Sequence, residues 1–277
     1  MNKSIFDHSD LFQNLKNEKK LILTDSDDTL RKSDGMISDK TKEAIQKIKK
    51  IGNTFVICTG RPRYHTLNLM KEVGTNPICI CSNGAEIYDS GNNKIIHAFY
   101  LNHEELLDLL ELAFTLDIRI ILSIEDKDYT TKVKNESQIL LDKNHFKEQI
   151  HDKKIKTCTF IDHRKDLMNK IKNILSEKKT LKIINENRKE EENTFWFTIG
   201  DKHVSKGNAI KILREYLNIP KENVISIGNG FNDLSMFQES GISVAVENAS
   251  SNIKEQATLV APSNDEDGVY HLLKLIK

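Results

Sequence analysis

Short apolar runs recur along the chain, and each one ends in polar or small residues. The runs are continuous rather than alternating, a pattern typical of strands that are covered on both faces, as in a parallel sheet. We therefore predict core strands at residues 21–23, 54–58, 77–81, 223–227 and 242–246.

Two segments between these runs show the spacing of amphipathic helices. The first begins with Ser38 as its cap and stops at Gly52, and the second ends before Pro220. Strands that alternate with helices predict an α/β fold, a doubly wound, Rossmann-like parallel sheet with ligands beyond the carboxyl ends of its strands. The residues expected on the buried helix faces are Ala44, Ile45, Ile48, Ile51, Ala209, Ile210, Leu213, Tyr216 and Leu217.

The middle of the chain breaks this rhythm. A β-hairpin is expected around residues 90–93, and amphipathic helices and short strands follow it. We interpret the apolar run at 194–199, which comes after a charged segment at 185–193, as the return to the main sheet. The prediction is a catalytic core of residues 1–85 and 194–277 with an inserted α+β domain at 86–193.

Composition narrows the class of protein. The 277 residues carry 41 basic and 41 acidic side chains, so overall charge does not favour a nucleic-acid binder. The longest apolar segment, residues 118–124, is far too short to cross a bilayer. The four cysteines show no zinc-like spacing and suit a reducing compartment. We expect a soluble, cytoplasmic protein without nucleic-acid or membrane partners.

Carboxylates crowd the end of the first strand. Asp25 and Asp27 are separated by one residue, so they share a face if the chain is extended there. Their repulsion would raise one pKa, whereas Mg²⁺, which prefers oxygen ligands, would relieve it. A solvated turn or a helix cap is the alternative. An EF-hand is excluded because Leu30 and Met36 occupy the positions of its glycine and glutamate.

Three further strand or helix ends carry candidate groups. Thr59 and Gly60 offer a hydroxyl and free N–H groups to a phosphate, or form only a turn. Lys206 follows Ser205, the expected helix cap, and a cation in the first turn opposes the helix dipole at a cost of roughly 0.3–1 kcal/mol. Its side chain either points to water or pairs with a nearby anion. The 228–233 loop adds Asp233, which caps the next helix or faces the site.

Together these groups suit phosphoryl transfer through an aspartyl phosphate. The motifs "DSDDTL", "TGRP", "SKGNAI" and "GNGFND", with "CSNGAEI" and "DEDGVYHLL", resemble those of haloacid dehalogenase-type phosphatases, specifically the Cof-like branch with a large cap between the second and third motifs. The resemblance implies a Rossmann-like core with an inserted cap and a bound Mg²⁺. It further implies Asp25 as nucleophile, Asp27 as acid and base, Thr59 and Lys206 on phosphate, Gly60, Arg61, Asn83 and Asn232 near phosphate or substrate, and Asp25, Asp27, Asn229 and Asp233 around the metal.

Two positions depart from the pattern of that family. Asp28 stands where the family has glycine, and Asn229 stands where it has a metal-binding aspartate. We expect weaker magnesium binding, with Asp233 as partial compensation. Asp28 either adds negative charge or occupies a turn that tolerates it.

The resulting hypothesis is a magnesium-dependent phosphatase for small phosphorylated metabolites, with sugar phosphates as the expected substrates. A sugar phosphomutase is one alternative, and a catalytically weakened binding or regulatory protein, suggested by Asn229, is another. The sequence identifies neither the substrate nor the cap residues that contact it, and it leaves a monomer and a homodimer equally open.

Overall fold

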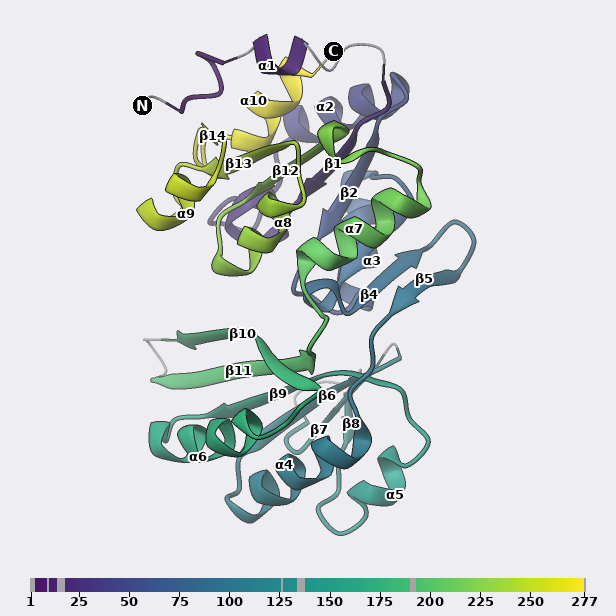
Figure 1. Ribbon diagram of the computed structural model, residues 1–277, viewed down its shortest axis with the longest axis vertical. Helices are drawn as coiled ribbons and strands as arrows, with labels where there is room; N and C mark the ends of the chain where they lie inside the picture. Colours follow the sequence, from purple (N-terminus) through teal and green to yellow (C-terminus); the bar gives the residue numbers. More distant parts are fainter. Residues whose placement is uncertain are drawn as a thin grey trace. The chain divides into compact units, whose positions relative to one another are not determined.

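The computed structural model describes residues 3–8, 10–13, 18–125, 127–133, 138–189 and 193–276. These residues form two compact units, each with its own sheet and helices (Figure 1). The first unit comprises Met1–His97 and Ser205–Lys277, and the second comprises Ala98–Val204.

The first unit contains a sheet with the strand order β14-β13-β12-β1-β2-β3-β4-β5. Neighbours from β14 to β3 are parallel, and β4 runs antiparallel to β3. This is the predicted doubly wound parallel sheet, extended by a hairpin. The bounds are β1 (Leu21–Thr24), β2 (Thr54–Cys58), β3 (Ile78–Cys81), β4 (Glu86–Asp89), β5 (Lys94–Ala98), β12 (Val224–Gly228), β13 (Ile242–Val246) and β14 (Leu259–Ala261).

Helices cover both faces of this sheet, which is why its strands are apolar throughout. Side chains of one face, such as Ile22 and Phe55, pack with α2 (Asp39–Lys50), α3 (Arg63–Val73) and α10 (Gly268–Leu275). Side chains of the other face, such as Leu23 and Val56, pack with α7 (Lys206–Tyr216), α8 (Leu234–Gln238) and α9 (Ser251–Gln256). The carboxyl ends of the parallel strands are left for loops.

The two predicted helices begin at the predicted caps. The Ser38 hydroxyl accepts a hydrogen bond from the Thr41 N–H, and the Ser205 hydroxyl accepts one from the Asn208 N–H. Two assignments to buried faces were wrong, because Ile51 and Tyr216 are 56% and 48% exposed. Both stand at the C-terminal end of their helix, and neither belongs to the core clusters.

The second unit has a six-stranded sheet in the order β10-β11-β9-β6-β7-β8. Its core joins one face of that sheet to α4 and α6. The bounds are α4 (His103–Thr115), β6 (Arg119–Ile124), β7 (Lys127–Thr130), β8 (Gln138–Leu140), α5 (Phe146–Ile150), β9 (Ile155–Asp162), α6 (Lys165–Ser176), β10 (Leu181–Lys189) and β11 (Thr194–Asp201).

The units divide later in the chain than the predicted boundaries at 86 and 193. The hairpin was correctly expected, but β4 pairs with β3 and so belongs to the first sheet. The run at 194–199 was wrongly interpreted as the return to that sheet, since it forms β11, which pairs with β9 and β10. Its alternating burial shows a sheet covered by helices on one face only. Residues 190–192 of the charged segment lie outside the described residues.

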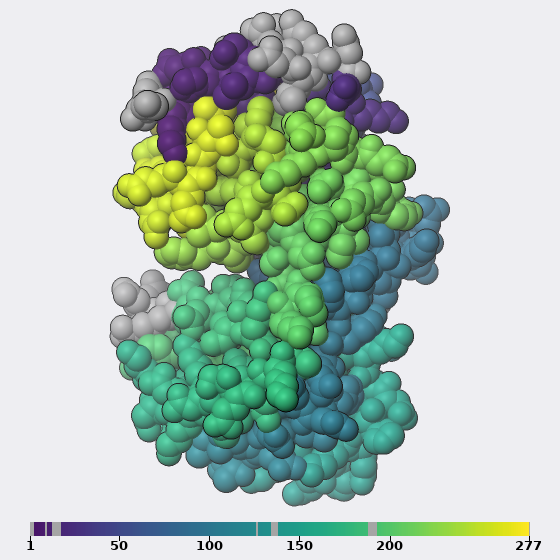
Figure 2. Space-filling view, in the orientation of Figure 1, coloured from purple at the N-terminus to yellow at the C-terminus, as the bar shows by residue number. Residues whose placement is uncertain are grey.

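The N-terminal residues extend the edge of the first sheet. Ser4 forms a parallel bridge with Val260 of β14, and the Ile5 N–H donates to the Val260 carbonyl at 3.0 Å. The purple N-terminal atoms accordingly lie against yellow C-terminal ones in Figure 2. Helix α1 (Asp10–Gln13) places Phe12 in the core that includes Ile22 and Phe55. Across the described ranges, no helix has the length and apolarity that a membrane span requires.

Candidate active site

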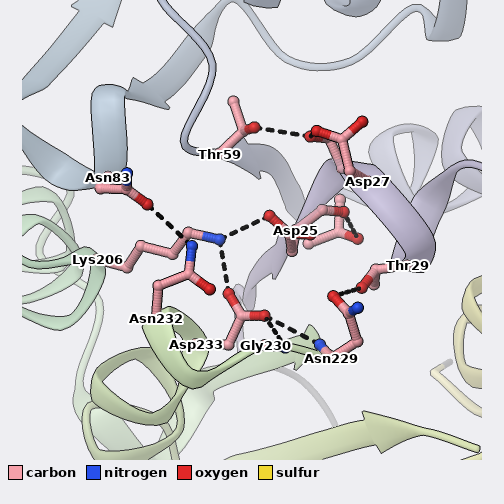
Figure 3. A network of polar contacts seen from close by, with 12 residues as sticks. Asp25, Asp27, Thr29, Thr59, Asn83, Lys206, Asn229, Gly230, Asn232 and Asp233 are labelled. Carbon is pink, nitrogen blue, oxygen red and sulfur yellow. Dashed lines mark hydrogen bonds and ion pairs between the residues drawn. The ribbon is translucent and has the colours of Figure 1, made fainter. Parts of the chain in front are cut away.

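The candidate residues meet at the carboxyl edge of the parallel strands in the first unit (Figure 3). Asp25 follows β1, Thr59 follows β2, Asn83 follows β3, and the loop with Asp233 follows β12. Lys206 is the first residue of α7. Residues from five places in the sequence therefore form one polar network.

A buried ion triad lies at the centre of this network. The Lys206 ammonium donates to Asp25 Oδ1 and to Asp233 Oδ1, at 2.6 Å in each case. The side chains of Lys206 and Asp233 are 0% exposed, and that of Asp25 is 10% exposed. Lys206 therefore forms ion pairs with two carboxylates rather than pointing to water. These pairs explain why a cation occupies the first turn of α7, where it opposes the helix dipole.

The triad has unequal charges, two carboxylates against one ammonium. Burial raises the pKa of Asp25 to about 7, with Lys206 opposing and Asp233 adding to the rise. Burial also works against the charged form of Lys206, but Asp233 and Asp25 outweigh it and raise the pKa of that ammonium. Lys206 therefore stays charged, and the pKa of Asp25 lies well above the usual range of a carboxyl group.

Asp27 does not join this triad, because Arg61 holds its carboxylate. Arg61 Nε donates to Oδ2 at 2.8 Å and Nη2 donates to Oδ1 at 2.5 Å, a bidentate pair. The side chain of Arg61 is 40% exposed and that of Asp27 is 50% exposed. Partial burial works to raise the pKa of Asp27, but the hydrogen bonds and charge of Arg61 prevail and lower it. The two aspartates were expected to share a face, yet they have different partners.

Thr59 ties the second strand end to the first. Its hydroxyl lies 2.7 Å from the hydroxyl of Ser26 and accepts a hydrogen bond from the Arg61 N–H at 3.2 Å. Ser26 also donates to Asp27 Oδ2 at 3.2 Å. Ser26 therefore links Thr59 to Asp27, a role that its hydroxyl inside "DSDDTL" did not reveal because serine is common in turns.

Asp233 organises the loop after β12. Its Oδ2 accepts hydrogen bonds from the N–H groups of Asn229 and Gly230, both at 2.9 Å. A β-carbon at Gly228 would lie 2.5 Å from this carboxyl group, so the loop needs glycine there. Asp233 therefore belongs to the site, as one of the two sequence alternatives had it, and its side chain holds the turn before α8 without capping that helix.

Asn229 and Asp28, the two departures from the family pattern, lie on facing loops. Asn229 Oδ1 accepts a hydrogen bond from the Thr29 hydroxyl at 3.0 Å. Asp28 has φ 55° and ψ 16°, the left-handed conformation that favours glycine and that aspartate tolerates better than most residues. Its carbonyl accepts from the Asn248 amide at 2.8 Å. The turn explains why glycine is usual at this position and why aspartate fits.

Asn83 and Asn232 meet each other directly. The Asn232 amide donates to Asn83 Oδ1 at 2.9 Å. Gly60, which was also expected near substrate, lies beside this pair, since a β-carbon there would be 3.2 Å from the Asn83 amide. Sequence reasoning placed all three near substrate but did not foresee the Asn83–Asn232 pair.

The donor set suits a hard cation. The described residues hold no cluster of three His, Cys, Asp or Glu side chains in metal-ligand geometry. The triad nevertheless has surplus negative charge, and Asn229 brings an uncharged amide oxygen to the same loop as Asp233. Carboxylate and amide oxygens are ligands that Mg²⁺ accepts, usually with water completing its shell.

Comparison with known proteins gives one consistent family. Residues 22–273 match the family model of haloacid dehalogenase-like hydrolases. The chain is 29% identical over 272 residues to the putative phosphatase YxeH of Bacillus subtilis, covering 92% of this chain and 97% of that protein. It is 28% identical over 250 residues to the 5-amino-6-(5-phospho-D-ribitylamino)uracil phosphatase YcsE of the same organism, covering 90% and 92%.

Solved structures agree with this result. A haloacid dehalogenase-like hydrolase from Bacteroides thetaiotaomicron superposes with a TM-score of 0.80 at 25% identity, covering 94% of this chain and 100% of that one. The subclass IIB sugar phosphatase BT4131 superposes with a TM-score of 0.75 at 20% identity, covering 92% and 98%. At 20% identity, the likeness to BT4131 shows a shared fold.

Proposed function

The chain belongs to the haloacid dehalogenase-like hydrolase family, and from this premise we propose a magnesium-dependent phosphatase that acts through an aspartyl phosphate on Asp25. The observation that carries the proposal is the triad, in which a buried ammonium lies 2.6 Å from the Asp25 carboxylate. A buried cation beside a carboxylate is suited to attract a phosphate dianion to that carboxylate. Its named relatives are phosphatases.

In the first half-reaction, an Asp25 oxygen attacks phosphorus as the bond from phosphorus to the ester oxygen breaks. The departing oxygen takes a proton from Asp27. In the second, water attacks the aspartyl phosphate, Asp27 accepts its proton, and the bond from phosphorus to Asp25 breaks to release inorganic phosphate. Lys206 and the Thr59 hydroxyl bind phosphoryl oxygens and keep them oriented throughout.

The Arg61–Asp27 pair bears on the proton transfers. Arg61 favours the ionised form of Asp27, which suits its role as base toward water. The acid role needs a proton on Asp27, so Arg61 must release it. A bound phosphate ester competes for the guanidinium, because phosphate accepts the same bidentate hydrogen bonds as a carboxylate. Arg61 is thus proposed to move from Asp27 to phosphate as the substrate binds.

Asp25 and the 228–233 loop are the proposed holders of magnesium. When bound, it would neutralise charge on the phosphoryl group and polarise it. Of the four residues expected as ligands, we propose Asp25 and Asn229 for direct contact, each of which has one oxygen that already accepts a hydrogen bond, from Lys206 and Thr29 respectively. Asp27 is engaged by Arg61, and both oxygens of Asp233 accept hydrogen bonds. Asp233 would therefore act through the loop and Lys206 rather than replace the missing carboxylate at 229.

Small phosphorylated metabolites are the proposed substrates, with sugar phosphates first among them. The relative YcsE is named for a phosphorylated ribityl compound, and BT4131 is called a sugar phosphatase. The second unit, Ala98–Val204, is the proposed source of selectivity.

Hydrolysis of p-nitrophenyl phosphate tests the function. Purified protein with Mg²⁺ should release p-nitrophenol, EDTA should abolish the release, and Asp25→Asn should lower kcat at least about 10³-fold. Inorganic phosphate release from a sugar phosphate without a bisphosphate activator would distinguish the phosphatase from a phosphomutase. Failure of any metal to support turnover that depends on Asp25 would contradict the proposal and favour a binding protein.

A further inference from the structure

The turn between β3 and β4 has an unusual backbone. Ser82, Asn83 and Gly84 have φ values of 50°, 57° and 96°, so three successive residues are left-handed. Only glycine adopts this region freely, and asparagine is better tolerated there than most residues. Ser82 and Asn83 are also 4% and 5% exposed. A buried turn with a disfavoured backbone persists only where contacts with the surrounding structure stabilise it.

The backbone of this turn holds the loop after β2. The Asn83 N–H donates to the Thr59 carbonyl at 3.0 Å, and the Ser82 N–H donates to the Arg61 carbonyl at 2.9 Å. These two bonds enclose Gly60, whose position lies against the Asn83 side chain. The turn therefore fixes the loop that carries the Thr59 hydroxyl and the Arg61 guanidinium.

The same turn also contacts the two other parts of the site. The Asn83 side chain accepts the 2.9 Å hydrogen bond from Asn232, which precedes Asp233. A β-carbon at Gly84 would lie 2.2 Å from the Ser205 carbonyl, directly before Lys206. Asn83 and its neighbours thus touch the Thr59 loop, the Asp233 loop and the start of α7.

We propose that Asn83 is a positioning residue whose pairing with Asn232 clamps the 228–233 loop to the Thr59 loop. The inference rests on the proposed function for its catalytic consequence, and it adds a mutual contact to two asparagines that were expected near phosphate or substrate. An uncharged amide suits this place, since a carboxylate would add negative charge beside Asp25 and Asp233. Loss of the clamp would let the loop with Asp233 move relative to Thr59.

Hydrogen exchange tests the clamp without any substrate. Asn83→Gly keeps the left-handed backbone but removes the side chain, so amides in residues 228–233 should exchange at least about tenfold faster than in wild type. Asn218→Gly is the matched control, an exposed asparagine with φ 54° on the surface of the same unit. Unchanged exchange at 228–233 in Asn83→Gly would overturn the proposal.

A double-mutant cycle tests the catalytic consequence. With p-nitrophenyl phosphate and Mg²⁺, Asn83→Gly and Asn232→Ala should each lower kcat about 10- to 100-fold with little change in KM, as displaced catalytic groups do. The kcat of the double variant should be no lower than that of the less active single variant. If the two single-variant reductions in kcat multiply in the double variant, or if only KM changes, the clamp is contradicted. Asn232→Ser replaces Asn232→Ala if the latter fails to fold. Wild-type protein without Asp25-dependent turnover would instead contradict the function, while the exchange experiment still decides the clamp.

Discussion

Lys206 and Asp25 are 181 residues apart in the sequence, yet they form a 2.6 Å ion pair inside the protein. The pair joins the start of α7 to the end of β1, and Asp233 extends it from the end of β12. One ammonium between two buried carboxylates leaves an excess of negative charge when both carboxylates are ionised, and this is an electrostatic asymmetry. That asymmetry underlies the predictions for Lys206 and Asp25.

Lys206→Met should remove both stability and activity. Two buried carboxylates would lose their shared cation, so we expect the free energy of unfolding to fall by about 3 kcal/mol or more. Turnover should fall at least about 100-fold, because the charge facing the phosphoryl group is gone. Urea denaturation and p-nitrophenyl phosphate assays measure the two effects. Lys211→Met, at an exposed position of the same helix, should change stability by less than about 0.5 kcal/mol.

The raised pKa of Asp25 predicts how stability depends on pH without metal. The folded pKa of about 7 exceeds the ordinary 3.8, so the native state binds the proton more tightly than the unfolded state does. The stabilising contribution is complete below pH 3.8 and is lost as pH rises toward 7. In EDTA, wild type should lose stability relative to Asp25→Asn by roughly 1.4 kcal/mol per pH unit across that window.

Urea titrations of both proteins between pH 4 and 8 provide the measurement for that pH dependence. A difference that stays constant, or that grows in favour of wild type as pH rises, would show that burial does not control Asp25. Added Mg²⁺ should reduce the slope, because a cation favours the ionised carboxylate.

Asn229→Asp should strengthen magnesium binding. The change restores a charged oxygen ligand at the position that faces Thr29, and we expect Kd to fall about tenfold or more. Isothermal titration of Mg²⁺ into both proteins measures this directly. Asn252→Asp adds the same charge on α9, so an equal gain there would attribute the effect to net charge and not to the ligand. No gain in Asn229→Asp would exclude residue 229 from the metal site.

Asp28→Gly should stabilise the protein. The residue has φ 55°, and glycine adopts that conformation without the steric cost of a β-carbon, so a gain of about 0.5–1 kcal/mol is expected. The hydrogen bond from Asn248 to the backbone carbonyl is unaffected by the change. Asp28→Ala should destabilise, and stabilisation by alanine in urea denaturation would show that backbone strain is not what residue 28 experiences.

Much of the fold was predictable because strands of a doubly wound sheet are apolar on both faces. The runs at 54–58 and 242–246 coincide with β2 and β13. The boundaries of the second unit were less predictable, since β4 and β11 have strand-like patterns that fit either sheet. Which sheet a strand joins depends on pairing partners that its own residues do not specify, and β11 pairs with β9 and β10.

The site shows the same division between local and distant information. Motifs at strand ends indicated that Asp25 and Asp233 would converge, because carboxyl ends of parallel strands share one edge. Lys206 begins α7 and follows no strand of that sheet, so only the family motif placed it at the site. The pairing of Arg61 with Asp27 was not visible, since it depends on how two flexible side chains are oriented. The Asn83–Asn232 bond likewise requires a left-handed turn that no local pattern specifies.

Trapping the covalent intermediate tests the central claim most directly. Wild-type protein with Mg²⁺ and a ³²P-labelled sugar phosphate, quenched in acid within milliseconds, should carry label on the peptide that contains Asp25. Borohydride reduction followed by mass spectrometry should convert Asp25 alone to homoserine, with Asp27 and Asp28 unchanged. Phosphate release with label absent from Asp25, or with reduction at another residue, would contradict the account.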